Sequence, residues 1–276
     1  MKHGLAAFSE FREALQMADR ILIATDFDGT LCPIAGDPSD VFLAPAMLGI
    51  LREVQQCERV TLAVISGRHL PDLRSRVPLD LIFAGNHGLE IAGGGCLFFH
   101  PAARRLHPLI AEAHQRLTVL QRDWPRAWTE YKELSLTLHY RNVDERRRHA
   151  LLFAARRCLN EFAPLLAFRV GLLALEIRPK VNWDKGSALA YIGETLGPFD
   201  LSICLGDDTT DESMFRANPG QLNIRVGRSG RTAAGHCLAD SVEVAIFLSR
   251  IANECVRRDS SPAPAAGIES LIDCSQ

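Results

Sequence analysis

The chain has 276 residues, of which 47% are hydrophobic and 23% charged, and its formal net charge is −2. This composition is typical of a globular protein with one large domain or two smaller ones. It offers no basic excess that would indicate nucleic acid or a membrane surface as a partner, and no apolar stretch approaches the roughly 18 residues that span a bilayer. The N-terminus lacks the apolar core of a signal peptide, so we expect a cytoplasmic protein.

The first predicted elements alternate between helices and strands. An amphipathic helix over residues 8–20 precedes a buried strand over 21–25, and a helix over 45–56 precedes a strand over 60–65. A further short strand covers 81–84. Alternation of this kind predicts a doubly wound, Rossmann-like α/β core with a parallel sheet.

The middle of the chain follows a different order. Residues 106–123 and 144–162 are predicted helices, whereas 128–141 and 167–178 are strand-like, with a turn at Gly171 in the second of these segments. Helix, two strands, helix, two strands is the pattern of a small α+β unit that could cover the sheet as a cap.

After this insert the core pattern returns. A helix over 185–196 precedes strands over 200–205 and 222–226, and a closing helix covers 241–252. Because the last residues include the run Ser260 to Pro264, we expect them to form a disordered tail. The predicted division is a first core segment at 1–104, an inserted α+β cap at 105–180, a second core segment at 181–256 and the tail at 257–276.

The most informative segment is 21–31, where the first buried strand ends at two aspartates, Asp26 and Asp28. Side chains alternate along a strand, so the two carboxylates can face one crevice at the strand end where open α/β sheets bind ligands. One carboxylate could attack a substrate while the other handles a proton, and both could hold a hard cation. The alternative is an ordinary Asp-x-Asp-Gly turn, which this segment alone does not exclude.

Three more sites follow in comparable positions, namely Ser66, Lys185 and the acidic run from Asp207 to Asp211. A carboxylate nucleophile, a hydroxyl donor, a cation and an acidic cluster are the groups that phosphoryl transfer needs. Hydrolysis of phosphate monoesters requires up to ~10²¹-fold acceleration, of which one general acid supplies only about 10²–10⁴. A covalent route with charge neutralisation by a metal ion and a lysine is therefore expected.

In order and spacing, these sites resemble the four motifs of haloacid-dehalogenase-like (HAD) phosphatases: Asp26-Phe27-Asp28-Gly29-Thr30, Ser66, Lys185, and Gly206-Asp207-Asp208-x-x-Asp211. The resemblance implies that Asp26 forms an aspartyl-phosphate and that Asp28 protonates the leaving oxygen and then activates water. It also implies that Ser66 and Lys185 hold the phosphoryl oxygens.

The same resemblance implies a Mg²⁺ site. Its ligands would be the Asp26 carboxylate, the Asp28 backbone carbonyl and Asp207, with Asp211 or Asp208 acting directly or through water. The position of the cap in the sequence indicates which subgroup of the HAD superfamily the chain resembles. The interval before residue 60 is too short for a folded cap, whereas the α+β unit lies between Ser66 and Lys185, as in sugar-phosphate phosphatases of this superfamily.

Further segments resemble trehalose-6-phosphate phosphatases, and the likeness spans residues 21–226. The segments are Ser66-Gly67-Arg68, Gly85-Asn86-His87-Gly88-Leu89-Glu90, Glu130-Tyr131-Lys132, Leu136-Thr137-Leu138-His139-Tyr140-Arg141, Leu175-Glu176-Ile177-Arg178-Pro179 and Gly206-Asp207-Asp208-Thr209-Thr210-Asp211-Glu212. The resemblance implies a sugar phosphate as substrate and a functional pairing with a trehalose-6-phosphate synthase. The residues that it places on the substrate are Arg68, Asn86, His87, Glu130, Lys132, Arg141, Glu176 and Arg178.

One departure concerns Tyr131, where the family commonly has an acidic residue. Strand alternation points Tyr131 away from its neighbours, so Glu130 and Lys132 can still share the substrate face. Without the resemblance, surface charge on exposed strand faces is the favoured interpretation of Glu130, Lys132, Arg141 and Glu176. Arg178 could instead pair with a carboxylate at the hinge before Pro179, and Arg68 could either orient the phosphate loop or stabilise the hinge.

Two functional alternatives stay open on the sequence. They are a phosphatase for another disaccharide or glycosyl-glycerate phosphate, and an inactive sugar-phosphate-binding module. The second would predict a damaged motif, whereas Asp26, Asp28, Lys185 and Asp207 are all present. The eight cysteines include no Cys-x-x-Cys pair, so neither a zinc site nor a disulfide framework is expected.

Overall fold

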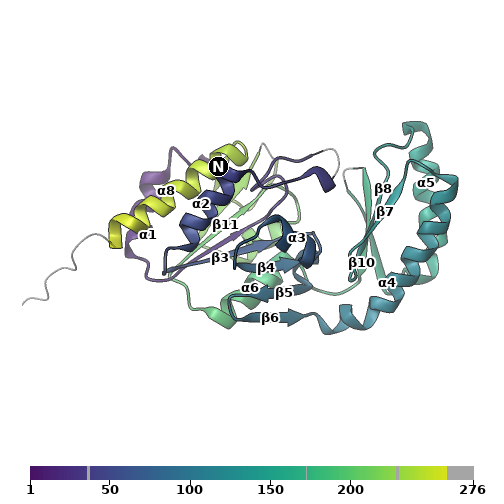
Figure 1. Cartoon of the computed structure of the whole chain (residues 1–276), viewed down its shortest axis with the longest axis horizontal. Coiled ribbons are helices and arrows are strands. Elements are labelled where there is room, and N and C mark those ends of the chain that lie inside the picture. Colours follow the sequence, from purple (N-terminus) through teal and green to yellow (C-terminus); the bar gives the residue numbers. More distant parts are fainter. Residues whose placement is uncertain (36–37, 172, 228–229, 260–276) are drawn as a thin grey trace, which may run out of the picture.

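The computed structural model describes residues 1–35, 38–171, 173–227 and 230–259, which form a core and a cap (Figure 1). The core contains a nine-stranded sheet with the order β1-β13-β12-β11-β2-β3-β4-β5-β6. Its strands are β1 (Lys2–His3), β2 (Ile21–Thr25), β3 (Val60–Ile65), β4 (Ile82–Gly85), β5 (Glu90–Gly93), β6 (Cys96–Phe99), β11 (Leu201–Gly206), β12 (Leu222–Val226) and β13 (His236–Leu238).

The sheet is parallel from β1 to β4, as predicted, whereas β5 and β6 pair antiparallel at its edge. The predicted elements do not include these two short strands, which a glycine-rich turn connects. Core strands in the middle of the sheet are buried on both faces, and this explains their nearly continuous apolar sequences.

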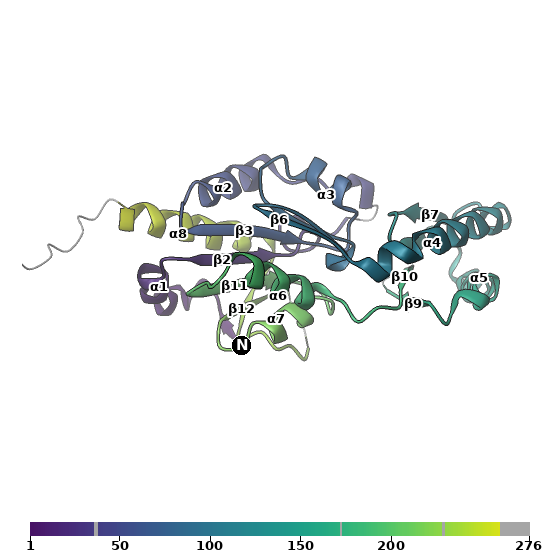
Figure 2. The ribbon, with the colours of Figure 1, turned by 90° about the horizontal axis from the view of Figure 1, so that it is seen from below.

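Helices cover both faces of the core sheet. They are α1 (Phe8–Met17), α2 (Pro45–Gln55), α3 (Leu70–Arg76), α6 (Lys185–Leu196), α7 (Glu212–Ala217) and α8 (Ser241–Asp259). Side chains of α1, α2, α3 and α8 join one apolar cluster, and those of α6 and α7 join another. Figure 2 shows α2 and α3 on the opposite side of the sheet from α6 and α7.

The cap is a four-stranded antiparallel sheet with two helices on one face. It consists of α4 (Pro101–Leu120), β7 (Trp128–Tyr131), β8 (Leu136–His139), α5 (Glu145–Cys158), β9 (Leu166–Val170) and β10 (Ala174–Pro179), with the strand order β7-β8-β10-β9. Apolar side chains of α4 and α5 pack on the outward face of the sheet. The opposite face of the cap sheet is directed toward the core (Figure 1).

Two predicted boundaries differ from the structure. Because α4 begins at Pro101, the cap starts before residue 105, and α8 runs to Asp259, so its last three residues belong to a helix rather than to the expected tail. The rest of that tail, 260–276, lies outside the described residues. Short 3-10 turns complete the chain at η1 (Pro38–Asp40), η2 (Asn86–Gly88), η3 (Gln121–Asp123) and η4 (Asn160–Phe162). Within the described ranges, no helix has both the length and the apolar character needed to cross a membrane.

Candidate active site

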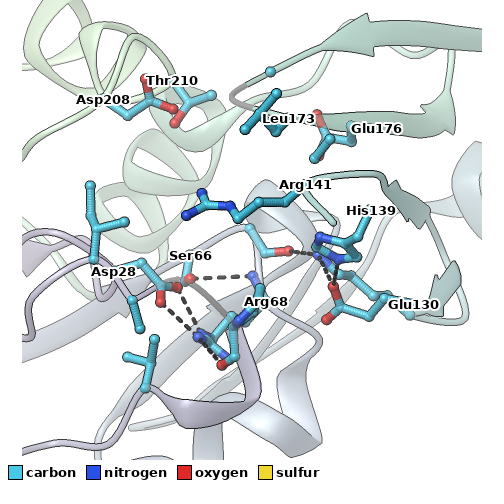
Figure 3. Close-up of a pocket in the computed structure, with 18 of the residues that line it drawn as sticks. Asp28, Ser66, Arg68, Glu130, His139, Arg141, Leu173, Glu176, Asp208 and Thr210 are labelled. Carbon is cyan, nitrogen blue, oxygen red and sulfur yellow. Dashed lines mark hydrogen bonds and ion pairs between the residues drawn. The ribbon is translucent and has the colours of Figure 1, made fainter. Parts of the chain in front are cut away.

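A cavity of about 730 Å³ lies between the carboxyl ends of the core strands and the free face of the cap sheet (Figure 3). Core side chains that line it come from the segments after β2, β3 and β11, and cap side chains come from β7, β8 and β10. Both halves of the predicted site therefore face one space, although they are far apart in the sequence.

Lys185 connects the acidic groups on the core side of the cavity. It begins α6, and its ammonium lies 2.8 Å from Asp26 Oδ1 and 2.6 Å from Asp211 Oδ1. Lys185 and Asp211 are buried, and Asp26 is only 5% exposed. Burial alone would lower the pKa of Lys185, but Asp211 and Asp26 outweigh it and hold the pKa above its ordinary value. Lys185 is thus a permanent cation beside the predicted nucleophile.

Asp207 brings a third carboxylate to this cluster. Oxygen atoms of Asp26, Asp207 and Asp211 lie within 4.8 Å of one another. Burial and the charges of Asp211 and Asp207 raise the pKa of Asp26 well above its ordinary value, against the opposing effect of Lys185. Burial and Asp211 likewise raise the pKa of Asp207 to about 6. Three crowded carboxylates with one lysine leave negative charge to be neutralised, and oxygen ligands are those that Mg²⁺ prefers, so the donor set fits this ion.

The close packing of this cluster explains Gly29 in the first motif. Gly29 has a φ of 80°, and a Cβ at this position would lie 2.1 Å from Asp207 Oδ2. Only glycine combines this left-handed backbone with such an approach. Asp208, in contrast, is exposed, and its carboxylate accepts a hydrogen bond from the backbone N–H of Thr209. It lines the cavity but lies outside the three-carboxylate cluster.

Asp28 lies at the cavity wall in a two-point contact with Arg68 (Figure 3). Arg68 Nε donates to Asp28 Oδ2 and Nη2 donates to Oδ1, both at 2.7 Å. The same guanidinium donates to Asp72 and to the carbonyl of Pro38. Four of its five N–H donors are therefore occupied by protein groups, and Arg68 supports Asp28 in this structure rather than extending freely toward the cavity.

The loop that follows β3 forms the floor beside Asp28. Ser66 is 1% exposed, and its Oγ accepts a hydrogen bond from the backbone N–H of Arg68. The ring of His87 covers Gly67 so closely that a Cβ there would lie 2.8 Å from two of its atoms. Glycine at this position therefore lets His87 pack on the loop predicted to bind phosphate.

Strand register places the cap carboxylates on one face. Thr137 pairs with Glu130 on one side and with Glu176 on the other, so these three residues form one row across the sheet. Side chains in such a row share a face. The structure therefore brings together Glu130 and Glu176, which are separated by 46 positions in the sequence, on the cavity wall.

Both cap carboxylates have cationic or imidazole partners. Glu176 accepts a hydrogen bond of 2.6 Å from His87 Nε2, and Glu130 lies 2.9 Å from His139 Nε2 and 3.4 Å from the Lys132 ammonium. Burial would raise the pKa of Glu176, but His87, Arg178 and Lys132 together hold it far below its ordinary value. Burial would also raise the pKa of Glu130, but His139 and Lys132 outweigh it and lower this pKa.

Of the remaining predicted substrate residues, Arg141 lies on the cavity wall and Figure 3 shows its guanidinium extending into the space between cap and core. Arg178 and Asn86 do not line the cavity. Burial and nearby Arg169 lower the pKa of Arg178, and Asn86 is 1% exposed with its amide group bound to other protein groups. Their direct contact with substrate stays a prediction.

The cavity also contains residues that the sequence analysis did not single out. The Trp128 and His139 rings stack with their centroids 4.0 Å apart, and Arg126 and Asn142 extend the wall beyond them. Strand alternation offers a signal for two of these, because Trp128 lies two positions before Glu130 and His139 two before Arg141. No comparable pattern distinguishes the loop residues.

Tyr131 lies on the opposite face, as alternation predicts. Its hydroxyl is 2.9 Å from His107 Nε2, and its ring stacks on His114, both in α4. Glu130 and Lys132 are left together on the cavity side. Tyr131, which departs from the family pattern, thus packs within the cap and does not displace Glu130 or Lys132 from the cavity side.

Comparisons with known proteins agree with this arrangement. The family model for trehalose-phosphatase matches residues 24–234. A probable trehalose-phosphate phosphatase 4 from Oryza sativa subsp. japonica is 36% identical over 271 residues, which cover 93% of this chain and 72% of the rice protein.

Two solved structures have a similar fold. A trehalose-6-phosphate phosphatase related protein, 27% identical, superposes with a TM-score of 0.76 over 86% of this chain and 99% of its own. The C-terminal domain of the C. albicans trehalose-6-phosphate phosphatase, 23% identical, has a TM-score of 0.73 over 89% and 96% of the two chains. With the family match covering most of the chain, this protein belongs to the trehalose-phosphatase family.

Proposed function

We propose that this protein hydrolyses trehalose 6-phosphate to trehalose and inorganic phosphate through an aspartyl-phosphate on Asp26, with Mg²⁺ as cofactor. The observation that carries the proposal is one cavity with two complementary walls. The core wall presents Asp26 beside the buried ammonium of Lys185, and the cap wall presents ionised Glu130 and Glu176. The first suits a phosphoryl group, and the second suits the hydroxyls of a sugar.

In the first step, an Asp26 carboxylate oxygen attacks phosphorus and the bond from phosphorus to the sugar oxygen breaks. Asp28 gives its proton to that oxygen, and trehalose leaves. In the second step, water attacks phosphorus, Asp28 takes a proton from the water, and the bond between Asp26 and phosphorus breaks to release phosphate. Lys185 and Ser66 hold the phosphoryl oxygens in both steps.

Asp28 must rearrange to perform this role. Both of its oxygens accept hydrogen bonds from Arg68, so a proton on either oxygen would replace a charge-assisted hydrogen bond. We therefore expect Asp28 to release at least one of these contacts when substrate enters. Asp26, Asp207 and Asp211 would hold the metal ion, which when bound would neutralise charge on the phosphoryl oxygens.

The test is release of inorganic phosphate from a panel of substrates, with Mg²⁺ and with a chelator. The panel contains trehalose 6-phosphate, another disaccharide phosphate, a glycosyl-glycerate phosphate, glucose 6-phosphate and p-nitrophenyl phosphate. Mg²⁺-dependent preference for trehalose 6-phosphate is expected. Similar rates on all substrates would contradict the role of the cap, and no hydrolysis of any of them would favour a sugar-phosphate-binding module. The substrate itself would be the product of a trehalose-6-phosphate synthase, the partner with which we propose that this enzyme acts.

A further inference from the structure

The turn between β7 and β8, residues 132–135, is bound to the core through Asn86. The backbone N–H of Lys132 donates to the carbonyl of Ser135, and Glu133 at the tip has a φ of 59°. Ser135 is only 2% exposed and Leu134 only 6%. Because this turn is buried against another part of the chain, its position is fixed. The cavity-facing side of the same sheet is open by comparison.

The polar contacts of this turn are made by Asn86, in η2 of the core. Its Nδ2 donates to the backbone carbonyl of Lys132 at 3.0 Å, and its Oδ1 accepts from Ser135 Oγ at 2.5 Å. Nδ2 also donates at 2.7 Å to Glu90, which itself accepts from the backbone N–H of Leu70. One buried amide thus joins the cap turn to two core segments.

An apolar contact also holds the turn 132–135 on the core. Leu134 at the cap turn belongs to a small buried cluster with Leu89 of the core and Ala103 of α4. Val181 and Trp183, in the segment by which the chain returns from cap to core, pack against this cluster. The contact between Asn86 and the turn 132–135 is therefore close to both connections between core and cap.

Asn86 and Lys132 also contact the loop of Ser66, Gly67 and Arg68, which is the predicted phosphate-binding loop. The backbone N–H of Asn86 donates to the carbonyl of Arg68, and the ammonium of Lys132 donates to the carbonyl of Gly67 at 3.3 Å. Lys132 is thus held at its own carbonyl by Asn86, while its side chain lies on the cavity wall above the loop that contains Ser66 and Gly67.

We propose that Asn86 is a positioning residue for sugar-phosphate selection, which clamps the turn from Lys132 to Ser135 onto the core and so places the Lys132 ammonium over the phosphate-binding loop. The inference rests on the proposed function, and it gives Asn86 a role other than direct contact with substrate. Asparagine suits the position because it supplies two donors and one acceptor, and because it tolerates the left-handed backbone that its φ of 48° requires.

The experiment compares Asn86→Asp and Ser135→Ala with the wild type on trehalose 6-phosphate and on p-nitrophenyl phosphate. Asn86→Asp removes the amide donors and places a second carboxylate beside Glu90, whereas Ser135→Ala removes one hydrogen bond with little change in shape, so it tests the clamp even where the first variant does not fold. Since misplacement by about 1 Å can cost ~10²-fold, we expect kcat/KM for the sugar phosphate to fall about 10- to 100-fold, mainly through KM, and the aryl phosphate value to fall less than about 3-fold. Thr118→Ala, which removes an exposed cap hydroxyl bonded to a carbonyl, is the matched control.

A double-mutant cycle with Lys132→Met separates positioning from general structural support. If Asn86 acts through Lys132, Ser135→Ala or Asn86→Asp will cause little further loss when Lys132 is already replaced. Equal losses on both substrates, or losses that add fully to that of Lys132→Met, would overturn the clamp. The two proposals fail separately. A wild type without preference for trehalose 6-phosphate contradicts the proposed function, whereas a selective wild type with fully additive variants contradicts the clamp.

Discussion

The core and the cap surround one cavity, yet they treat their carboxylates in opposite ways. In the core, burial raises the pKa values of Asp26 and Asp207, and the charge of neighbouring Asp211 raises both further. In the cap, Glu130 and Glu176 each have imidazole or cationic partners, and their pKa values are lowered. A carboxylate's role in this cavity therefore depends on whether its neighbours leave negative charge unpaired or neutralise it.

This difference suits different ligands. Unpaired negative charge around Asp26 and Lys185 forms a site that a divalent cation and a phosphoryl group would complete. Carboxylates that stay ionised in the cap are instead strong acceptors for neutral hydroxyls and need no added charge. The core would therefore determine the reaction, and the cap would determine which leaving group is accepted.

The largest expected effect comes from Asp26→Asn in the core. Removal of the proposed nucleophile should lower kcat at least about 10³-fold on trehalose 6-phosphate and on p-nitrophenyl phosphate alike, because the proposed mechanism uses the same attack on phosphorus for both. Steady-state phosphate release measures the loss, and circular dichroism checks the fold. Asp80→Asn, at an exposed position, is the control. Residual activity above about a tenth of wild type on either substrate would exclude Asp26 as nucleophile.

A smaller and more selective effect is expected from Glu176→Gln in the cap. Loss of a charged hydrogen-bond acceptor costs about 1.5–3 kcal/mol, so kcat/KM for trehalose 6-phosphate should fall about 10- to 100-fold. The value for p-nitrophenyl phosphate, which has no sugar, should change less than about 3-fold. Glu145→Gln, in the exposed first turn of α5, provides the control. If both substrates lose activity equally, Glu176 supports the structure of the site rather than selecting the sugar.

The core half of the site could be predicted from the sequence because its chemistry lies at strand ends. Asp26 follows β2 and Asp207 follows β11, and each strand is recognisable from its apolar run. The sequence alone did not indicate that Asp26 and Asp207 lie next to each other. The pairing of Thr25 with Leu205 brings these two strand ends together, and it results from the tertiary arrangement of the sheet.

Prediction was less complete in the cap. Alternation correctly placed Glu130 and Lys132 on one face, but the row that joins Glu130 to Glu176 depends on the register of three strands, which no local pattern specifies. Asn86 and Arg68 show a second limit. The resemblance predicts that both side chains contact substrate, whereas the structure shows their donors bound to Glu90, Asp28 and other protein groups.

The smallest expected effect is a pH dependence of stability that separates the two kinds of carboxylate. Because the folded-state pKa of Glu176 lies below its ordinary value of 4.5, its contribution to stability is fully present above that value and is lost as the pH falls toward the folded-state pKa. The difference in Tm between the wild type and Glu176→Gln should therefore shrink as the pH falls below about 4.5. Thermal denaturation at several pH values measures it, with Glu145→Gln as the reference for an exposed carboxylate. A Tm difference that instead grew below pH 4.5 would mean that Glu176 is not held ionised by His87, Arg178 and Lys132, and the contrast between cap and core would not hold.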